Sequence, residues 1–308
     1  MPDSRGEFQL IQWIQRRIPP HVQVPLGIGD DAAWLKFNQN GESLVTVDML
    51  LEGVHFTLET ATPFQIGWKS LGVNLSDIAA MGGRAVAAVV GIALPRSRAW
   101  ELAQGVQQGI EALAQQFKVC IAGGDTNTWD GPLVISITAL GEPLPAGPVR
   151  RSGARPGDWI LVTGDLGGSI SGKHLNFIPR LEEARLLQEH VELHAMIDIS
   201  DGLAADLQHI LDESRVGARI MAAQVPISKA ALSATDDRTP LAHALGDGED
   251  FELLLTLSPA DAQALLAKPI FDTPLSHIGM IIEEQTAELI QPDGSRSPWS
   301  ATGWKHSF

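Results

Sequence analysis

The segments SLVTVDMLLEGVHF, residues 43–56, and WKSLGVNLSDIAAMGG, residues 68–83, decide how the rest of the chain is interpreted. The first segment predicts a buried strand, because apolar side chains surround a lone carboxylate at Asp48. The second predicts an amphipathic helix that is capped by Thr62 and has Pro63 in its first turn. The residues that keep the helical spacing and end the helix are Ile66, Leu71, Leu75, Ile78 and Gly82-Gly83.

Two carboxylates occupy unusual places in these elements. Asp48 lies within the apolar strand, and Asp77 lies near the end of the apolar helix. A carboxylate is costly to bury unless a cation pairs with it. The pattern therefore predicts a metal site, and further acidic groups along the chain repeat it.

Length and charge set limits on the fold and the partners. The 308 residues are 44% hydrophobic and 19% charged, which predicts two globular domains. The formal net charge of −15 argues against nucleic acid or an anionic membrane as a partner. An acidic protein can still bind anionic substrates when divalent cations mediate the contact.

Cysteine usage and the N-terminal segment indicate the compartment. Cys120 is the only cysteine and lies in an apolar run, so we expect no disulfide framework and a reducing cytoplasm. The first residues, MPDSRGEF, show no basic and apolar signal-peptide pattern. No apolar run approaches the length of a membrane span. Residues 4–18 predict a first amphipathic helix instead.

The segment LGIGDDAAWL, residues 26–35, places Asp30 and Asp31 after two glycines and before an apolar strand. Adjacent acids directed into one site repel each other strongly without a cation. A solvated Asp-Gly turn is the alternative interpretation.

The middle of the chain predicts a strand over 85–95, a helix over 98–117, and then a strand, a Gly-rich turn and a second strand. The turn, residues 123–126, combines backbone N–H groups with Asp125, a combination that can hold a phosphate and its metal ion. An ordinary turn is the alternative.

The Pro- and Gly-rich residues 142–157 form the best linker candidate. Its arginines are Arg150, Arg151 and Arg155, and an arginine here either is solvated or contacts a phosphate.

Residues 167–173 match the G-x-x-x-x-G-K pattern of a P-loop and follow a predicted strand. The next residue is His174, so the Ser or Thr hydroxyl that would bind Mg²⁺ is missing. We therefore interpret this segment as a Gly-rich turn.

The segment IDISDGLAADLQHILDE, residues 197–213, places Asp198, Ser200 and Asp201 before a helix. Ser200 or Asp201 could be a helix N-cap, which would not explain Asp198. Further on, a Gly turn with Asp247, Glu249 and Asp250 precedes a strongly apolar strand. The tail carries Trp299, Trp304 and Phe308, aromatic residues that either dock on their own domain or cover a flat ligand.

Seven motifs in order resemble the thiamine-monophosphate kinase family, within the aminoimidazole-ribonucleotide synthetase-like ATP-binding superfamily. The resemblance runs from GEF at 6–8 to the GWKHSF tail. The motifs are GIGDDAA (27–33), TVDMLLEGVHF (46–56), NLSDIAAMG (74–82), AGGDT (122–126), RSGARPGD (151–158), IDISDGL (197–203) and GDGEDFEL (246–253).

The resemblance implies a homodimer of two-domain α/β chains with mixed sheets, in which the N-terminal domains meet. The domains would be residues 1–142, which bind Mg²⁺ and ATP, and 143–308, which complete the site. The implied reaction is phosphorylation of thiamine monophosphate by ATP with several Mg²⁺ ions. The implied metal ligands are Asp31, Thr46, Val47 through its backbone, Asp48, Asp77, Asp125, Asp198 and Asp201. The implied ATP contacts are Gly124, Asp125, Arg151 and Ser200, and the implied substrate contacts are His55, Glu249 and Trp304.

Three residues depart from the family pattern. Val47 stands where a polar residue is common, Trp304 where tyrosine is common, and Asp247 where a small residue is common. These departures bear on substrate fit more than on the class of reaction.

The chemistry of the reaction explains why the motifs offer no general base. A phosphate monoester is largely dianionic at neutral pH, since its second pKa is about 6, so the acceptor needs no deprotonation. We expect direct in-line transfer. The alternatives are a ligase-type ATP enzyme of the same superfamily, which activates an amide oxygen, and a non-catalytic metal-binding scaffold.

Overall fold

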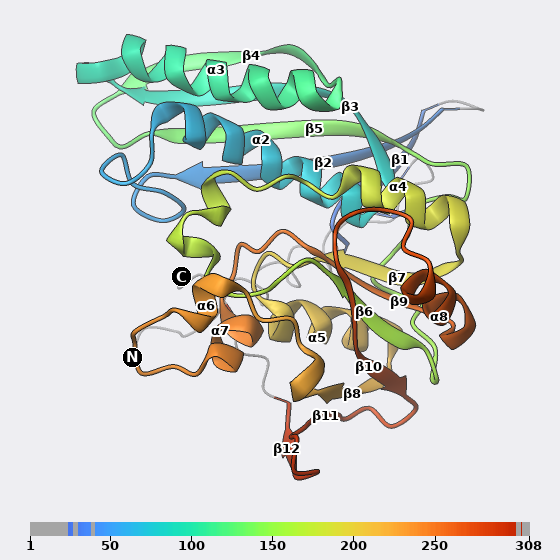
Figure 1. The fold of residues 1–308 in the computed structure, drawn as a ribbon. Coiled ribbons are helices and arrows are strands. Elements are labelled where there is room, and N and C mark those ends of the chain that lie inside the picture. Colours follow the sequence, from blue (N-terminus) through green and yellow to red (C-terminus); the bar gives the residue numbers. More distant parts are fainter. Residues whose placement is uncertain (1–23, 27–29, 38–40, 300–302, 304–308) are drawn as a thin grey trace, which may run out of the picture.

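The computed structural model describes residues 24–26, 30–37, 41–299 and 303. Two units, each built around a β-sheet, lie one above the other in Figure 1. The N-terminal sheet has the strand order β1-β2-β5-β3-β4, and the C-terminal sheet has the order β12-β11-β8-β10-β6-β9-β7. Both sheets contain parallel and antiparallel pairs, so the predicted mixed α/β fold is confirmed.

The N-terminal strands are β1 (Ala33–Phe37), β2 (Gly41–Leu51), β3 (Gly83–Pro95), β4 (Cys120–Trp129) and β5 (Val134–Pro143), and the helices are α2 (Pro63–Ala80) and α3 (Ala99–Phe117). The C-terminal strands are β6 (Trp159–Thr163), β7 (Leu193–Asp198), β8 (Gly217–Met221), β9 (Leu253–Leu257), β10 (Leu275–Ile282), β11 (Ala287–Ile290) and β12 (Arg296–Pro298). The C-terminal helices are α4 (Leu181–His190), α5 (Leu203–Ser214), α6 (Lys229–Leu232), α7 (Pro240–Gly246) and α8 (Pro259–Ala267).

The start of α2 follows the sequence signals. Thr62 and Gln65 form a capping box, and Pro63 is the first helical residue. The helix predicted over 98–117 is α3. Residues 144–158, all of them described, contain neither helix nor strand, as the linker interpretation expects.

The turn predicted at residues 123–126 is wrong. These residues belong to β4, which pairs in parallel with β3 after a register shift between Ala88 and Val89. Gly123 has a φ of +148°, so its backbone provides the local irregularity without ending the strand. The turn lies later, between β4 and β5.

Helices α2 and α3 cover one face of the N-terminal sheet (Figure 1), and two glycines permit their close approach. A Cβ atom on Gly67 would lie 1.9 Å from the carbonyl oxygen of Val106. A Cβ atom on Gly109 would lie 1.9 Å from the carbonyl oxygen of Phe64. Backbone therefore packs directly against backbone at this crossing.

The opposite face of the N-terminal sheet is exposed. Val47 and Met49 of β2 are 62% and 56% exposed, and Val89 and Leu140 also expose their side chains. This group of four residues is called the open sheet face below. An exposed group of large apolar side chains on one sheet face is typical of a protein interface.

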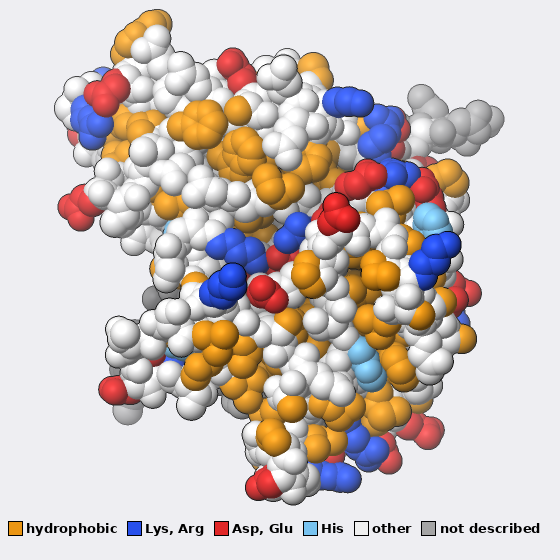
Figure 2. Space-filling model, viewed as in Figure 1, with side chains coloured by type: hydrophobic (Ala, Val, Ile, Leu, Met, Phe, Trp, Pro, Cys, Tyr) orange, Lys and Arg blue, Asp and Glu red, His pale blue; other side chains and the backbone are white. Residues whose placement is uncertain are grey.

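The end of α2 reaches the C-terminal unit. Ala79 and Ala80 are buried in one apolar cluster with Met196 of β7 and Leu253 of β9. Acidic and basic side chains gather along the boundary between the two units (Figure 2). Within the described part of the chain, no helix has the length and apolar character needed to cross a bilayer.

Candidate active site

Carboxylates from three distant parts of the chain meet at the junction of the two units. Asp31 precedes β1, Asp77 lies in the last turn of α2, and Asp198 ends β7. One oxygen of each lies within 4.8 Å of the others. Such a group repels itself strongly unless protons or cations compensate the charge.

Hydroxyl groups orient these carboxylates. Thr46 Oγ1 donates to Asp77 Oδ2, and Ser76 Oγ donates to Asp198 Oδ2 at 2.6 Å. Asp48 lies on the same face of β2 as Thr46, and its buried Oδ2 has no hydrogen-bond partner among the described residues. A buried oxygen without a partner is costly, whereas a divalent cation would satisfy it. The residues at this junction therefore fit a cation site.

The pKa values of these carboxyl groups agree with a cation site. Burial raises the pKa of Asp48 to about 6. Burial, together with the charge of Asp31, raises the pKa of Asp198 to about 8. Burial and the charges of Asp48 and Asp198 raise the pKa of Asp77 well above its ordinary value. A bound cation favours the ionised form of each acid and would reverse these shifts.

Arg151 reaches the cluster from the segment between the units. Its Nη2 and Nε donate to the two carboxylate oxygens of Asp31 at 2.8 and 3.1 Å, and its backbone N–H donates to Asp30 at 3.2 Å. Burial, and then repulsion from Asp31, raises the pKa of Asp30 to about 7, although Arg151 opposes the shift. The guanidinium fork matches either a carboxylate or a phosphate. Arg150 and Arg155 are exposed.

A second group of possible ligands lies at the start of α5 and in the loop that precedes this helix. Asp201, Asp206 and His209 each offer one ligand atom within 4.8 Å of the others. Asp206 Oδ2 accepts the backbone N–H groups of Asp201 and Gly202 at 3.1 and 3.0 Å. The N-cap of α5 is Gly202, which excludes the alternative that Ser200 or Asp201 caps this helix. The sequence analysis did not predict Asp206. The signal that could have found it is a carboxylate on the buried face of a helix.

Glu249, Ser200 and His55 are also brought together. The backbone N–H of Glu249 donates to the carbonyl oxygen of Ser200 at 2.6 Å. The Glu249 carboxylate accepts from Lys69 Nζ at 2.6 and 2.7 Å, and Lys69 also donates to the carbonyl oxygen of His55. Lys69 was missed as well, although a lysine three residues after Ile66 on the apolar face of α2 is a detectable signal.

The P-loop-like turn does not present its N–H groups to a phosphate. Gly167 donates to Asp250 Oδ2 and Gly168 donates to Asp247 Oδ2, both at 2.8 Å. Lys173 Nζ donates to Glu252 Oε1 at 2.8 Å and to the carbonyl oxygen of Asp165 at 3.1 Å. Carboxylates of the protein occupy the donors that a P-loop would offer, which supports the interpretation as a Gly-rich turn.

The additional charge of Asp247 is compensated within the C-terminal unit. Asp247 Oδ1 accepts from Arg238 Nη1 at 2.6 Å, and Asp247 Oδ2 lies 2.9 Å from His243 Nδ1. Its side chain is 12% exposed. This departure from the family pattern therefore adds little net charge near Glu249.

Asp125 and Gly124 do not join the cluster of Asp31 within the described part of the chain. Gly124 lies in the same row of the sheet as Asp48, with one residue each of β5 and β3 between them. Three strand spacings separate the two positions, about 14 Å. Asp125 has the opposite side-chain direction, toward the open sheet face, and its carboxylate accepts from Asn127 at 3.4 Å.

The side chain of Val47 lies on the open sheet face, opposite to Thr46 and Asp48. Trp304, the predicted helix over 4–18, Gly27, Gly29 and Phe308 lie outside the described residues. Trp299 docks on its own unit, since its Nε1 donates to the carbonyl oxygen of Ala204 at 3.2 Å.

Comparison with known proteins finds the same organisation. The N-terminal domain of AIR synthase related protein matches residues 29–142, and the C-terminal domain matches residues 155–291. A thiamine-monophosphate kinase of Rhodopirellula baltica is 42% identical over 285 residues, 90% of this chain and 89% of the relative. That of Bacillus subtilis is 32% identical over 313 residues, 92% and 94% of the two chains.

A solved structure, AaThiL complexed with AMPPCP and TMP, superimposes with a TM-score of 0.84 at 28% identity. The match covers 99% of this chain and 100% of that chain. Two mixed sheets, joined by α2 and lined with acids at their junction, thus define an AIR synthase related protein. Within that class, the chain belongs to the thiamine-monophosphate kinase family. The resemblance predicted from the seven motifs is confirmed.

Proposed function

We propose that the protein transfers the terminal phosphoryl group of ATP to thiamine monophosphate, giving thiamine diphosphate and ADP. The observation that carries the proposal is the cluster of Asp31, Asp77 and Asp198. Beside it lies a buried oxygen of Asp48 that has no hydrogen-bond partner among the described residues. The relatives named thiamine-monophosphate kinase, and AaThiL complexed with AMPPCP and TMP, support this substrate pair.

The cation that suits these ligands is Mg²⁺, because the donors are hard oxygens. Bound Mg²⁺ would neutralise phosphate charge and align the donor with the acceptor. We assign the ligands to Asp31, Thr46, Val47 through its backbone, Asp48, Asp77, Asp125, Asp198 and Asp201. Both reactants are anions, so without such compensation their repulsion would oppose binding.

The other site residues divide between the two substrates. Arg151, Ser200 and Gly124 are assigned to ATP, and His55, Glu249 and Trp304 to thiamine monophosphate. Glu249 suits the cationic thiazolium ring, and an aromatic face would attract the same cation by about 0.5–2 kcal/mol. The guanidinium of Arg151 would exchange its Asp31 partner for a phosphate when cations bind Asp31.

The transfer needs no general base, because the acceptor phosphate is already largely dianionic, with a second pKa of about 6. His55 Nδ1 accepts the backbone N–H of Leu51 at 3.1 Å, so that nitrogen already serves the turn after β2. We assign a direct in-line transfer without a phosphoenzyme. Isolation of a phosphorylated aspartate during turnover would contradict this route.

The first test mixes the purified protein with ATP, Mg²⁺ and thiamine monophosphate and follows both products by chromatography. Equal amounts of thiamine diphosphate and ADP are expected. The Asp48→Asn variant should lose at least about 100-fold in turnover, because one cation ligand is gone. Unphosphorylated thiamine is the substrate control. If the protein binds ATP but forms no thiamine diphosphate, the assignment of thiamine monophosphate as the substrate is wrong. That result would favour a ligase-type reaction.

We also propose a homodimer in which Asp125 serves the site of the partner subunit. The open sheet face is apolar, and the described strands leave two edges unpaired, β4 and residues 46–51 of β2. Sheets with exposed edges and an apolar face pair with a second chain. If β4 of one subunit lies beside β2 of the other, the backbone at residues 123–126 approaches residues 46–51 of the partner subunit, the segment that holds the partner's Asp48.

Mixing two inactive variants tests this arrangement. Asp48→Asn and Asp125→Asn dimers, unfolded together and refolded, should regain about a quarter of the wild-type activity, because half of the dimers then hold one intact site. No regain would place both residues in the site of one subunit. A monomer in light scattering would exclude the dimer itself. We further propose that residues 1–142 and 143–308 form the two domains, and that the protein is located in the cytoplasm.

A further inference from the structure

Lys69 is a lysine enclosed in the middle of α2, at the junction of the two units. Its side chain is 0% exposed. Nζ donates to Glu249 Oε1 at 2.6 Å, to Glu249 Oε2 at 2.7 Å and to the carbonyl oxygen of His55 at 2.6 Å. An ammonium group has three donors, so all three are used inside the protein. A direct role of Lys69 in phosphate binding would require these bonds to break.

The ion pair is a costly way to fill this space. Burial lowers the pKa of Lys69, and the charge of Glu249 opposes that shift. A buried ion pair is often no more stable than apolar residues of the same volume, because desolvation offsets the attraction. Stability alone therefore does not explain a lysine here. What the pair does provide is a fixed position for each of its members.

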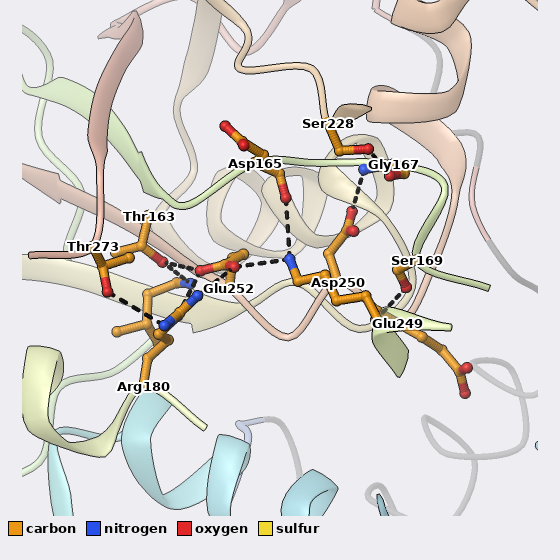
Figure 3. Close-up of polar contacts among 12 residues, drawn as sticks. Thr163, Asp165, Gly167, Ser169, Arg180, Ser228, Glu249, Asp250, Glu252 and Thr273 are labelled. Carbon is orange, nitrogen blue, oxygen red and sulfur yellow. Dashed lines mark hydrogen bonds and ion pairs between the residues drawn. The ribbon is translucent and has the colours of Figure 1, made fainter. Parts of the chain in front are cut away.

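Glu249 is the outward-facing member of the pair, with its side chain 20% exposed. Its backbone has a φ of +65°, a conformation that costs a residue with a Cβ atom about 1–2 kcal/mol. Ser200 accepts from its N–H, and Ser169 Oγ donates to its carbonyl oxygen. Figure 3 shows that the Glu249 side chain points away from the buried Glu252 network. Strained positions persist when several contacts fix them, and Lys69 is the contact that fixes the side chain.

We propose that Lys69 is a positioning residue that directs the Glu249 carboxylate toward the cationic ring of thiamine monophosphate. This inference rests on the proposed function, because it uses the assignment of Glu249. Lys69 does not touch the substrate. Lys69 binds the Glu249 carboxylate from the buried side of the pair. The carbonyl oxygen of His55 accepts from Lys69 and so fixes its position. Its loss should weaken binding of thiamine monophosphate and leave binding of ATP at the acid cluster nearly unchanged.

The test compares Lys69→Met, which removes the charge at similar volume, with Lys173→Met as a matched control. Lys173 also binds a buried carboxylate, that of Glu252, but no proposed substrate contact. The KM of each substrate is measured separately, together with the Tm. Lys69→Met should raise the KM for thiamine monophosphate about 10- to 100-fold. Its KM for ATP, and both KM values of Lys173→Met, should change less than about threefold.

Two results would overturn the proposal. A lower Tm with an unchanged KM for thiamine monophosphate would make the pair purely structural. An equal rise of both KM values would indicate general disorder of the site. A wild-type protein that makes no thiamine diphosphate would instead overturn the proposed function, before any variant is compared.

If Lys69→Met does not fold, the comparison moves to a background without the Glu249 charge. The double variant Lys69→Met/Glu249→Gln leaves no unpaired buried ion. Because Lys69 acts through Glu249, the double variant and Glu249→Gln should share a KM for thiamine monophosphate within about twofold. A larger KM in the double variant would show that Lys69 acts independently of Glu249 and would overturn the proposal.

Discussion

At the scale of single residues, Asp206 organises the loop that carries Ser200 and Asp201. Its buried carboxyl group lies in the first turn of α5 and accepts two backbone N–H groups of that loop. Burial, followed by repulsion from Asp201, raises its pKa well above the ordinary value. The loop therefore owes its shape to a side chain that follows it in the sequence.

Substitution of Asp206 tests this role. Asp206→Ala removes the acceptor of two N–H groups and should lower the free energy of unfolding by about 2–4 kcal/mol. Asp206→Asn keeps one oxygen acceptor and should cost less than half as much. Urea denaturation of both variants provides the measurement. Equal losses would mean that the hydrogen bonds to the loop contribute little.

His243 provides a pH-dependent contribution to stability. Its Nδ1 lies 2.9 Å from Asp247, and its Nε2 lies 2.9 Å from Asp236. Only the protonated ring donates from both nitrogens. Burial lowers the pKa of His243, but its hydrogen bonds to Asp247 and Asp236 outweigh burial, and the pKa is raised above 6.5. The stabilisation is thus complete below pH 6.5 and is lost as the pH rises through the raised pKa.

We therefore expect the free energy of unfolding of wild type to exceed that of His243→Gln by on the order of 1 kcal/mol at low pH. The difference should shrink at a pH above the raised pKa. Urea denaturation at about pH 5.5 and pH 9 compares the two states of the ring. His190→Gln, at the exposed end of α4, is the control. A difference that grows with pH would contradict the assignment.

At the scale of elements, the crossing of α2 and α3 depends on glycine. Gly109→Ala would place a Cβ atom 1.9 Å from the carbonyl oxygen of Phe64. The backbone of one helix must move to relieve this overlap. We expect a loss of about 1–3 kcal/mol, even though alanine is the better helix former. Thermal unfolding gives the Tm of Gly109→Ala and of the control Gln108→Ala, which lies on the exposed face of α3. A gain in Tm for Gly109→Ala would show that the helices separate without cost.

At the scale of the whole molecule, the proposed homodimer depends on the open sheet face. Met49→Glu places a charge at a position that is 56% exposed in a single chain, and it should convert the proposed dimer to monomers. Turnover should fall at least about 10-fold if the partner's Asp125 completes the site. Trp100→Glu changes a residue that is 78% exposed on α3 and is the control. Light scattering and turnover give the readout. Active monomers of Met49→Glu would contradict the shared site.

The sequence predicted elements better than it predicted contacts. The apolar spacing and the cap at Thr62 located α2, because both signals are local. The β4 strand was missed at residues 123–126, since pairing with β3 overrides the turn preference of two glycines. Asp31, Asp77 and Asp198 were found as separate motifs, but their meeting depends on how the two units pack. Lys69 was missed because its partner Glu249 is 180 residues away.

The burial of the end of α2 has a consequence for how the chain can be divided. Ala79 and Ala80 belong in sequence to the N-terminal match, yet they are packed in the core of the C-terminal unit. If the chain were cut between the two matched ranges, the C-terminal fragment would lack Ala79 and Ala80, two buried residues of that apolar cluster. Chimeras that exchange halves between relatives would have to carry compatible residues at the end of α2. We therefore expect the two halves to fold as one cooperative unit.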